Sequence, residues 1–199
     1  TLGLMHNMGA SYSFPVDSLR SPSFTQKYGT TPSIMDYARN NYVAQRGDFE
    51  KGVRMVPPLM GVYDMHAINW GYRIFKDAKT AEDEYPYLNK IITDKKGDPM
   101  YEFGAQQLFL NEDPTDQTED LGNDHIKASN YGIENLKYII SNIDKWFAQE
   151  NKNYDDIQEM YLACVSQYMR YLTHVMPYLG GVEYKDIVQD GESNYAKRY

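Results

Sequence analysis

The chain has 199 residues, of which 42% are hydrophobic and 14% aromatic, and these are enough apolar side chains to bury the core of one domain. Its 28 acidic and 20 basic residues give a formal net charge of -8, which argues against a nucleic-acid-binding surface. No apolar run approaches the roughly 20 residues that cross a bilayer, and the single cysteine, Cys164, excludes a disulfide within the chain.

Residues 1–62 are rich in glycine, proline, serine, threonine and asparagine, and prolines interrupt every long period in this stretch. We therefore expect turns and short irregular elements in this third of the chain. Long structured loops in a compact chain usually carry function. The remaining residues, 63–199, are expected to form a helical subdomain that makes one compact unit with residues 1–62.

Helical signals begin at Asp64, which we expect to cap a short helix reaching Ile74. Thr80 and Asp83 predict a capping box for a second helix, which ends near Gly97. The next stretch contains a strand-like run at 100–103 and an acidic, proline-containing loop, and its pattern assigns no regular element.

Two long helices follow. Apolar residues at steps of three and four predict the first from about 123 to 149. The second, 155–179, repeats this spacing, begins at a capping box of Asp155 and Gln158, and stops at two glycines. The short polar link between them predicts an antiparallel helix hairpin. The fold class is therefore mainly α, with a loop-rich N-terminal third.

The end of the chain carries weaker signals. Pro177 is expected to kink the last helical turn. Residues 182–188 are a candidate strand, with Asp190-Gly191 as the turn into a partner strand at 193–199.

The run Gly3-Leu4-Met5-His6-Asn7 carries the first chemical motif. Gly3 and His6 have the spacing of the final GxxH in HExxHxxGxxH, so the run resembles the end of the metzincin zinc motif. In that motif two histidines and a general-base glutamate lie on one helix, and a turn at the glycine places the third histidine near them. The HExxH would lie directly before Thr1. Taken alone, GxxH is a weak match, and the alternative is a histidine in a polar loop.

A second motif follows downstream. Ser33-Ile34-Met35-Asp36-Tyr37 matches the SxMxY pattern of the metzincin Met-turn. The resemblance implies that Met35 gives the imidazoles an apolar floor. It implies that Tyr37 ligates the resting metal or binds the oxyanion of the tetrahedral intermediate. The alternative is that Met35 is one of ten methionines filling the core and Tyr37 one of nineteen tyrosines. The order of the two motifs favours the metzincin interpretation.

The wider runs 6–11 and 33–39 resemble the bacterial Met-zincin domain family of large secreted zinc-dependent metalloproteases, and 63–64, 69–73 and 119–124 are similar to runs typical of it. The resemblance implies zinc, a mainly helical subdomain below the active-site cleft, and export to the periplasm, the cell surface or the medium. Asn7 departs from many metzincins, in which an acidic residue follows the third histidine. Asp36 stands where several relatives carry histidine.

Other polar residues have structural interpretations. His66, His125 and His174 lack a second ligand at turn spacing, so packed or surface positions are favoured over metal ligation. Five acidic residues could bind calcium, but they lack the spacing of a known calcium loop, and a solvated acidic surface is favoured: Asp113, Asp116, Glu119, Asp120 and Asp124. Cys164 lies among apolar helix positions and is expected in the core rather than as a nucleophile.

The sequence thus predicts the C-terminal portion of a zinc-dependent metalloendopeptidase, acting on protein or peptide and completed by an N-terminal part of the same protein. His6 is the predicted metal ligand, Gly3 and Met35 support it, and the loops at 38–62 are expected to wall the primed substrate side. Without HExxH the chain alone is expected to be inactive and to bind zinc weakly or not at all. The alternatives are a helical module that binds peptide or glycan through its tyrosines, and a hydrolase built on Cys164.

Overall fold

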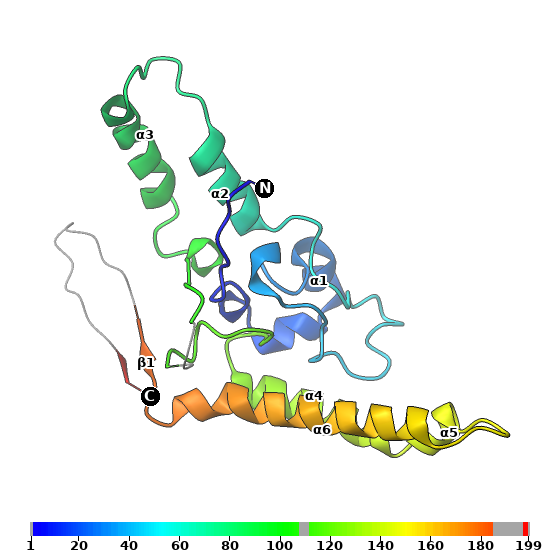
Figure 1. Cartoon of the computed structure of the whole chain (residues 1–199). Coiled ribbons are helices and arrows are strands. Elements are labelled where there is room, and N and C mark those ends of the chain that lie inside the picture. The colour runs from blue at the N-terminus through cyan, green and yellow to red at the C-terminus, as the bar shows by residue number, and fades with distance from the viewer. Residues whose placement is uncertain (1, 108–111, 185–196, 199) are drawn as a thin grey trace.

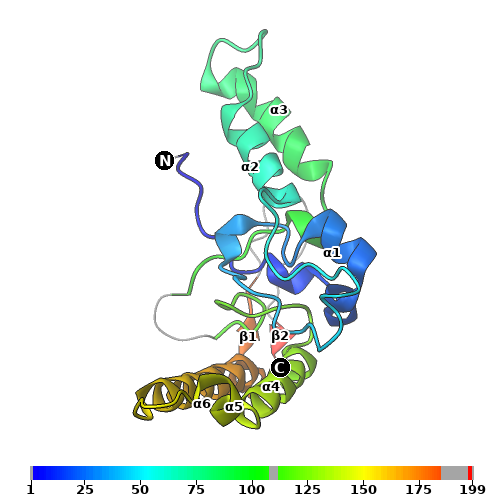
Figure 2. The ribbon, with the colours of Figure 1, turned by 90° about the vertical axis from the view of Figure 1, so that its right-hand side faces the viewer.

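The computed structural model describes residues 2–107, 112–184 and 197–198. It confirms a mainly helical fold with a loop-rich N-terminal third. That third forms the middle of the molecule, helices α2 and α3 project from one side of it, and α4, α5 and α6 lie together on the other side (Figures 1 and 2). The α-helices are α1 (Pro22–Tyr28), α2 (Val62–Tyr72), α3 (Ala81–Thr93), α4 (His125–Ile140), α5 (Ile143–Phe147) and α6 (Asp155–Val175).

Short 3-10 turns carry much of the irregular backbone. They are η1 (Ser11–Ser13), η2 (Val16–Arg20), η3 (Ile34–Asp36), η4 (Pro99–Tyr101) and η5 (Met176–Tyr178). The strand-like run at 100–103 is therefore not a strand where it overlaps η4, because Asp98 caps the turn by accepting a hydrogen bond from the Met100 amide, 3.1 Å away.

Helices α2 and α3 begin in different ways. The prediction that Asp64 caps α2 is wrong by one turn: Gly61 is the cap residue, and Asp64, in the first turn, accepts a hydrogen bond from its amide at 2.7 Å. The capping box of α3 is confirmed, since the Thr80 hydroxyl accepts from the Asp83 amide and the Asp83 carboxylate accepts from the Thr80 amide. None of the residues of α3 is buried.

The antiparallel hairpin of α4 and α6 is confirmed, and both views show the two helices side by side (Figures 1 and 2). The single predicted helix over 123–149 is wrong in one respect, because it breaks between α4 and α5. There the Ser141 hydroxyl and the Asn142 amide group both donate to the Tyr138 carbonyl, each at 2.9 Å. Side chains that bond nearby backbone in this way compete with the helical ladder.

The ends of α6 also differ in detail from the prediction. The cap residue is Tyr154, which makes no side-chain capping bond, so the proposed box of Asp155 and Gln158 is not formed. Helix α6 ends at Val175 rather than at 179, and Pro177 lies in the following turn η5 instead of kinking the helix, because proline cannot donate to a helical carbonyl.

The last element is a short antiparallel pair of strands, β1 (Val182–Glu183) and β2 (Lys197–Arg198), with Val182 opposite Arg198. This places strands at parts of the two predicted segments. The predicted turn at Asp190-Gly191 lies outside the described residues.

Two apolar clusters form the core, and Tyr42 packs against both of them. The first cluster joins the N-terminal third to the start of α4, and the second fills the α4–α6 interface. Gly132 of α4 lies so close to the Tyr171 ring that an added Cβ would approach its Cζ to 2.5 Å. Buried residues of the first cluster are Phe14, Val16, Leu19, Ala38, Val43, Leu121 and Ala128; those of the second are Leu136, Cys164 and Tyr171.

Candidate metal site

The structure brings His6 and Tyr37 together. The Tyr37 hydroxyl lies 2.7 Å from His6 Nε2, and the two ring centroids are 4.7 Å apart. The other ring nitrogen, Nδ1, lies 2.8 Å from Oε1 of Gln106. The imidazole and the phenol of two separate motifs are therefore in contact, and the Gln106 side chain contacts the second ring nitrogen of the imidazole.

The backbone at both motifs is unusual. Gly3 has a φ of 72°, a left-handed conformation that glycine adopts without steric cost and that suits the turn before His6. Tyr37 has a φ of 48° and a ψ of 20°, which is uncommon for a residue with a side chain and costs on the order of 1 kcal/mol. The Arg39 amide donates to the Tyr37 carbonyl at 2.7 Å, and its guanidinium lies 5.7 Å from the Tyr37 ring centroid.

Asn7 ties the histidine segment to two other parts of the chain. Its backbone amide donates to the Met35 carbonyl at 3.1 Å. Its buried side chain donates to the Glu102 carbonyl at 3.0 Å and accepts from the Gly104 amide at 2.8 Å. Asparagine, in place of the acidic residue that many metzincins carry here, thus has a structural role, because an acidic side chain has no N–H to donate to the Glu102 carbonyl.

Asp64 fastens the turn that carries Met35. Its buried carboxylate accepts hydrogen bonds from the Ser33 hydroxyl at 2.7 Å, the Ile34 amide at 3.0 Å and the Gly61 amide at 2.7 Å. The Ser33 hydroxyl in turn accepts from the Met35 amide at 3.1 Å. Sequence reasoning missed this role, because an aspartate before apolar helix positions reads as a helix cap.

Asp36 belongs to the same turn, and its side chain is fully buried. Its Oδ2 accepts from the Ser11 amide and, at 3.0 Å, from the Thr31 hydroxyl. Burial, followed by the charge of nearby Asp120, raises the pKa of the Asp36 carboxyl well above its ordinary value. The turn is therefore fixed from below to the segment that follows His6.

The remaining histidines have packed positions, as the sequence favoured. Buried His125 donates from Nε2 to Asp120 Oδ2 at 2.7 Å, and the Tyr178 hydroxyl lies 3.0 Å from its Nδ1. His174 donates from Nε2 to the Thr118 carbonyl at 3.1 Å. Half-buried His66 meets the Tyr101 ring edge-on at a centroid distance of 5.1 Å.

The solvated-surface interpretation of the acidic cluster is wrong for Asp113 and Asp120, which are buried. Asp113 accepts from the Thr115 and Tyr184 amides, while Glu119 pairs with two arginines, Arg39 at 3.3 Å and Arg170. Asp124 caps α4 through the Lys127 amide. Among the described residues, no group of three histidine, cysteine, aspartate or glutamate side chains could hold a metal ion.

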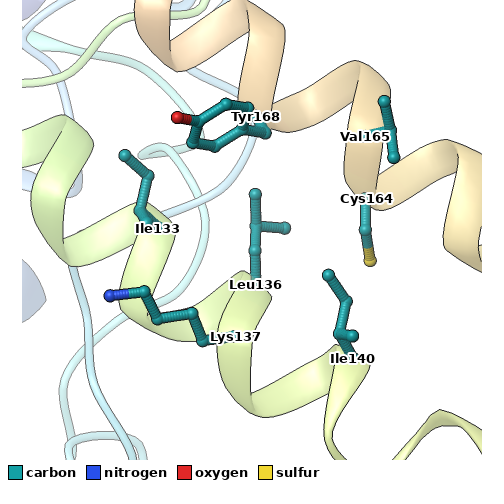
Figure 3. A pocket seen from close by; sticks show the side chains of 7 residues that line it. All are labelled: Ile133, Leu136, Lys137, Ile140, Cys164, Val165 and Tyr168. Carbon is teal, nitrogen blue, oxygen red and sulfur yellow. The ribbon is translucent and has the colours of Figure 1, made fainter.

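Cys164 faces an apolar hollow between α4 and α6. Its sulfur points toward α4, beside Leu136 and Ile140 (Figure 3). Burial raises the pKa of the Cys164 thiol, which opposes formation of the thiolate nucleophile. The core role expected for Cys164 is confirmed by its burial in the second cluster.

The donor set at His6 fits part of a zinc site. An imidazole nitrogen is a zinc ligand, and the Tyr37 phenol, for which the Met-turn resemblance implies a contact with the resting metal or the oxyanion, lies 2.7 Å from it. Catalytic zinc sites hold three protein ligands. With His6 as one of the three, no group of histidine, cysteine, aspartate or glutamate side chains among the described residues supplies the other two.

A family model described as Met-zincin matches residues 1–198. The chain belongs to the Met-zincin family. No curated protein and no solved structure matches it. Met-zincin membership links the chain to zinc metalloproteases and implies zinc as the metal of the intact protein. In the part of the Met-zincin chain that the structure describes, every helix is too short or too polar to span a bilayer.

Proposed function

We propose that this Met-zincin chain forms the floor and one ligand of the active site of a zinc-dependent metalloendopeptidase. The observation that carries the proposal is the contact of the Tyr37 hydroxyl with His6 Nε2, at 2.7 Å across 31 residues of sequence. It supports the two motifs as parts of one site. In this proposal His6 is the third zinc ligand, Gly3 forms the turn that leads to it, and Met35 lies beneath the imidazoles.

Each residue has a defined task. Zinc, when bound, lowers the pKa of a coordinated water and polarises the scissile carbonyl. His6 presents Nε2 while Gln106 holds its Nδ1. Tyr37, freed from His6, donates its hydroxyl proton in a hydrogen bond to the oxyanion of the tetrahedral intermediate. The general base and two more imidazoles come, in this proposal, from an HExxH segment directly before Thr1.

Exposed apolar side chains around the site support a covering segment. Met5 is 72% exposed, Leu2 54% and Ile34 45%. All three belong to the segments that carry the two motifs, and exposed apolar side chains beside a site favour contact with other protein. A helix carrying HExxH would bury this apolar rim as it brings its histidines to His6.

Two further statements belong to this proposal. The substrate is a protein or peptide, bound with its primed side along the loops at 38–62. The whole protein works after export, in the periplasm, at the cell surface or in the medium. Separation of cell fractions followed by detection of the protein tests the location, and a purely cytoplasmic protein would refute it.

The first experiment uses the 199-residue chain alone. We expect no cleavage of an unfolded protein such as casein, and weak or no zinc binding, because one imidazole and a phenol are too few ligands. Peptidase activity of the chain alone that persists in a chelator would refute the zinc mechanism.

The second experiment uses the protein extended upstream of Thr1. The extended protein should cleave casein and lose this activity on chelation. His6→Ala should lower its zinc content, whereas Tyr37→Phe should keep zinc and lower kcat by about 10²–10³-fold, the effect of losing one oxyanion donor. His66→Ala, a control at another half-buried histidine, should keep both zinc and activity. An extended protein without HExxH, without zinc, or with full activity after His6→Ala would overturn the proposal.

A further inference from the structure

Gln106 contacts one ring nitrogen of His6 while Tyr37 contacts the other. Its Oε1 lies 2.8 Å from His6 Nδ1, across 100 residues of sequence. An amide oxygen only accepts hydrogen bonds. With Oε1 as the amide atom that faces the ring, the proton of the neutral imidazole belongs on Nδ1, which leaves the lone pair of Nε2 to accept from the Tyr37 hydroxyl at 2.7 Å.

The chain holds Gln106 in place from both sides. Two residues earlier, Gly104 bonds the histidine segment: its amide donates to Asn7 Oδ1 at 2.8 Å, and its carbonyl accepts from the Met8 amide at 2.9 Å. Gly104 also has no room for a side chain, because an added Cβ would lie 2.0 Å from Asp116 Oδ1. The backbone that leads to Gln106 is thus fixed against the segment that carries His6.

On the other side, the neighbouring Gln107 closes the acidic loop. Its side-chain oxygen accepts from the amides of Glu112 and Asp113, at 2.7 and 2.9 Å, and its amide group donates to the carbonyls of Asp113 and Asp116, each at 2.8 Å. All four bonds of the Gln107 amide are satisfied. With Gly104 and Gln107 both anchored, the position between them is set, and Gln106 is directed at His6.

We propose that Gln106 is a positioning residue that fixes the tautomer and ring orientation of His6, so that Nε2 is the nitrogen presented to Tyr37 and to a metal. The tautomer stands on the contact itself, and its consequence for zinc rests on the proposed function. A neutral amide has this effect without adding a charge near the metal. Partners that orient a metal-binding histidine typically change metal affinity about 10–100-fold when removed.

The tautomer is measured on the chain alone, without metal. With four histidines in the sequence, long-range ¹H–¹⁵N correlation of the ¹⁵N-labelled protein at alkaline pH distinguishes protonated from bare ring nitrogens, and His6→Ala assigns the His6 signals. We expect His6 to carry its proton on Nδ1. Gln106→Leu should move the proton to Nε2 in a large share of the molecules, and Gln106→Glu should restore the Nδ1-H form. Gln149→Leu, at an exposed glutamine, is the control.

Two results would overturn the inference. One is a His6 protonated at Nε2 in the unaltered chain, which would mean that Gln106 donates through its amide group. The other is a Gln106→Leu spectrum in which His6 keeps its Nδ1 proton.

The consequence for zinc is measured by chelator competition on the protein extended upstream of Thr1. Gln106→Leu should weaken zinc binding about 10–100-fold, with rescue by Gln106→Glu. Unchanged affinity would refute the metal-positioning role. An extended protein that binds no zinc at all would instead refute the proposed function, while the tautomer result on the chain alone still tests Gln106.

Discussion

Replacing Asp64 by alanine removes the fastening of the Met-turn to α2. The carboxylate accepts three hydrogen bonds, from the Ser33 hydroxyl, the Ile34 amide and the Gly61 amide. Asp64 itself is 1% exposed, and its bonds to the Ser33 hydroxyl and the Gly61 amide are buried. Alanine leaves all three donors without this partner, two of them in buried surroundings.

The magnitude follows from these contacts. A buried donor left without a partner costs about 1–3 kcal/mol, and the three costs are not additive, because the turn can relax toward solvent once it is released. We expect Asp64→Ala to lower the free energy of unfolding by about 3–5 kcal/mol. For a chain of this size each kcal/mol lowers Tm by about 2–4 °C, so the expected fall is roughly 6–20 °C.

Two variants separate the hydrogen bonds from the mere change of residue. Asp64→Asn should cost less, about 1–2 kcal/mol, because its amide oxygen can still accept from the two backbone amides and its amide group can donate to the Ser33 hydroxyl. Asp77→Ala, at an exposed aspartate, should change the stability by less than about 0.5 kcal/mol. Urea unfolding followed by tyrosine and tryptophan fluorescence measures all three. An Asp64→Ala protein as stable as Asp77→Ala would refute the fastening.

Three further predictions concern other positions. Gly61→Ala should destabilise the fold by about 1–3 kcal/mol or more, because its Cβ would lie 1.8 Å from the Pro32 carbonyl oxygen. Gly71→Ala, with open space around it, should be neutral or stabilise α2 by up to about 1 kcal/mol. Equal effects of the two substitutions in urea unfolding would contradict this. Burial, with neighbouring carboxylates, raises the pKa of Asp116 from 3.8 to about 7. The folded state therefore holds this proton more tightly than the unfolded chain, and the stability it contributes is full below about pH 4 and is lost as the pH rises through about 7. The free energy of unfolding should be higher at about pH 5 than at about pH 8, and this difference should be about 3 kcal/mol larger in the unaltered chain than in Asp116→Asn. Equal differences in the two proteins would exclude the pKa shift. Thr80→Ala should cost α3 about 1 kcal/mol, seen as faster hydrogen exchange within α3 rather than as a lower global Tm, because none of its residues is buried.

Local signals predicted most of the helical architecture. The apolar spacing of three and four located α4 and α6, and the pairing of Thr80 with Asp83 located the start of α3. The break after Ile140 was missed because it depends on Ser141 and Asn142 bonding back to the Tyr138 carbonyl. Spacing of apolar residues contains no information about such side-chain competition.

The candidate site divides in the same way. His6 and Tyr37 were recognisable because each belongs to a motif with fixed spacing, and their contact agrees with the order of the motifs. The role of Gln106 carried no signal, and Asn7 stood out only as a departure from the family pattern, because the partners of both side chains lie 95 to 100 residues away. A glutamine in an irregular segment is ordinary until the fold brings it to a histidine.

The fastening of the Met-turn also determines how such a site would be filled. The side chains of Asp64 and Asp36 and the backbone amide of Asn7 hold the turn, so its shape does not depend on an ion. Binding of zinc would then carry little cost of ordering the loop, and affinity would not be reduced by a small binding-competent population. Loss of the ion should leave the chain folded, unlike in small zinc fingers, which unfold without metal. A zinc-depleted protein of this kind would stay folded and could bind the metal again without refolding.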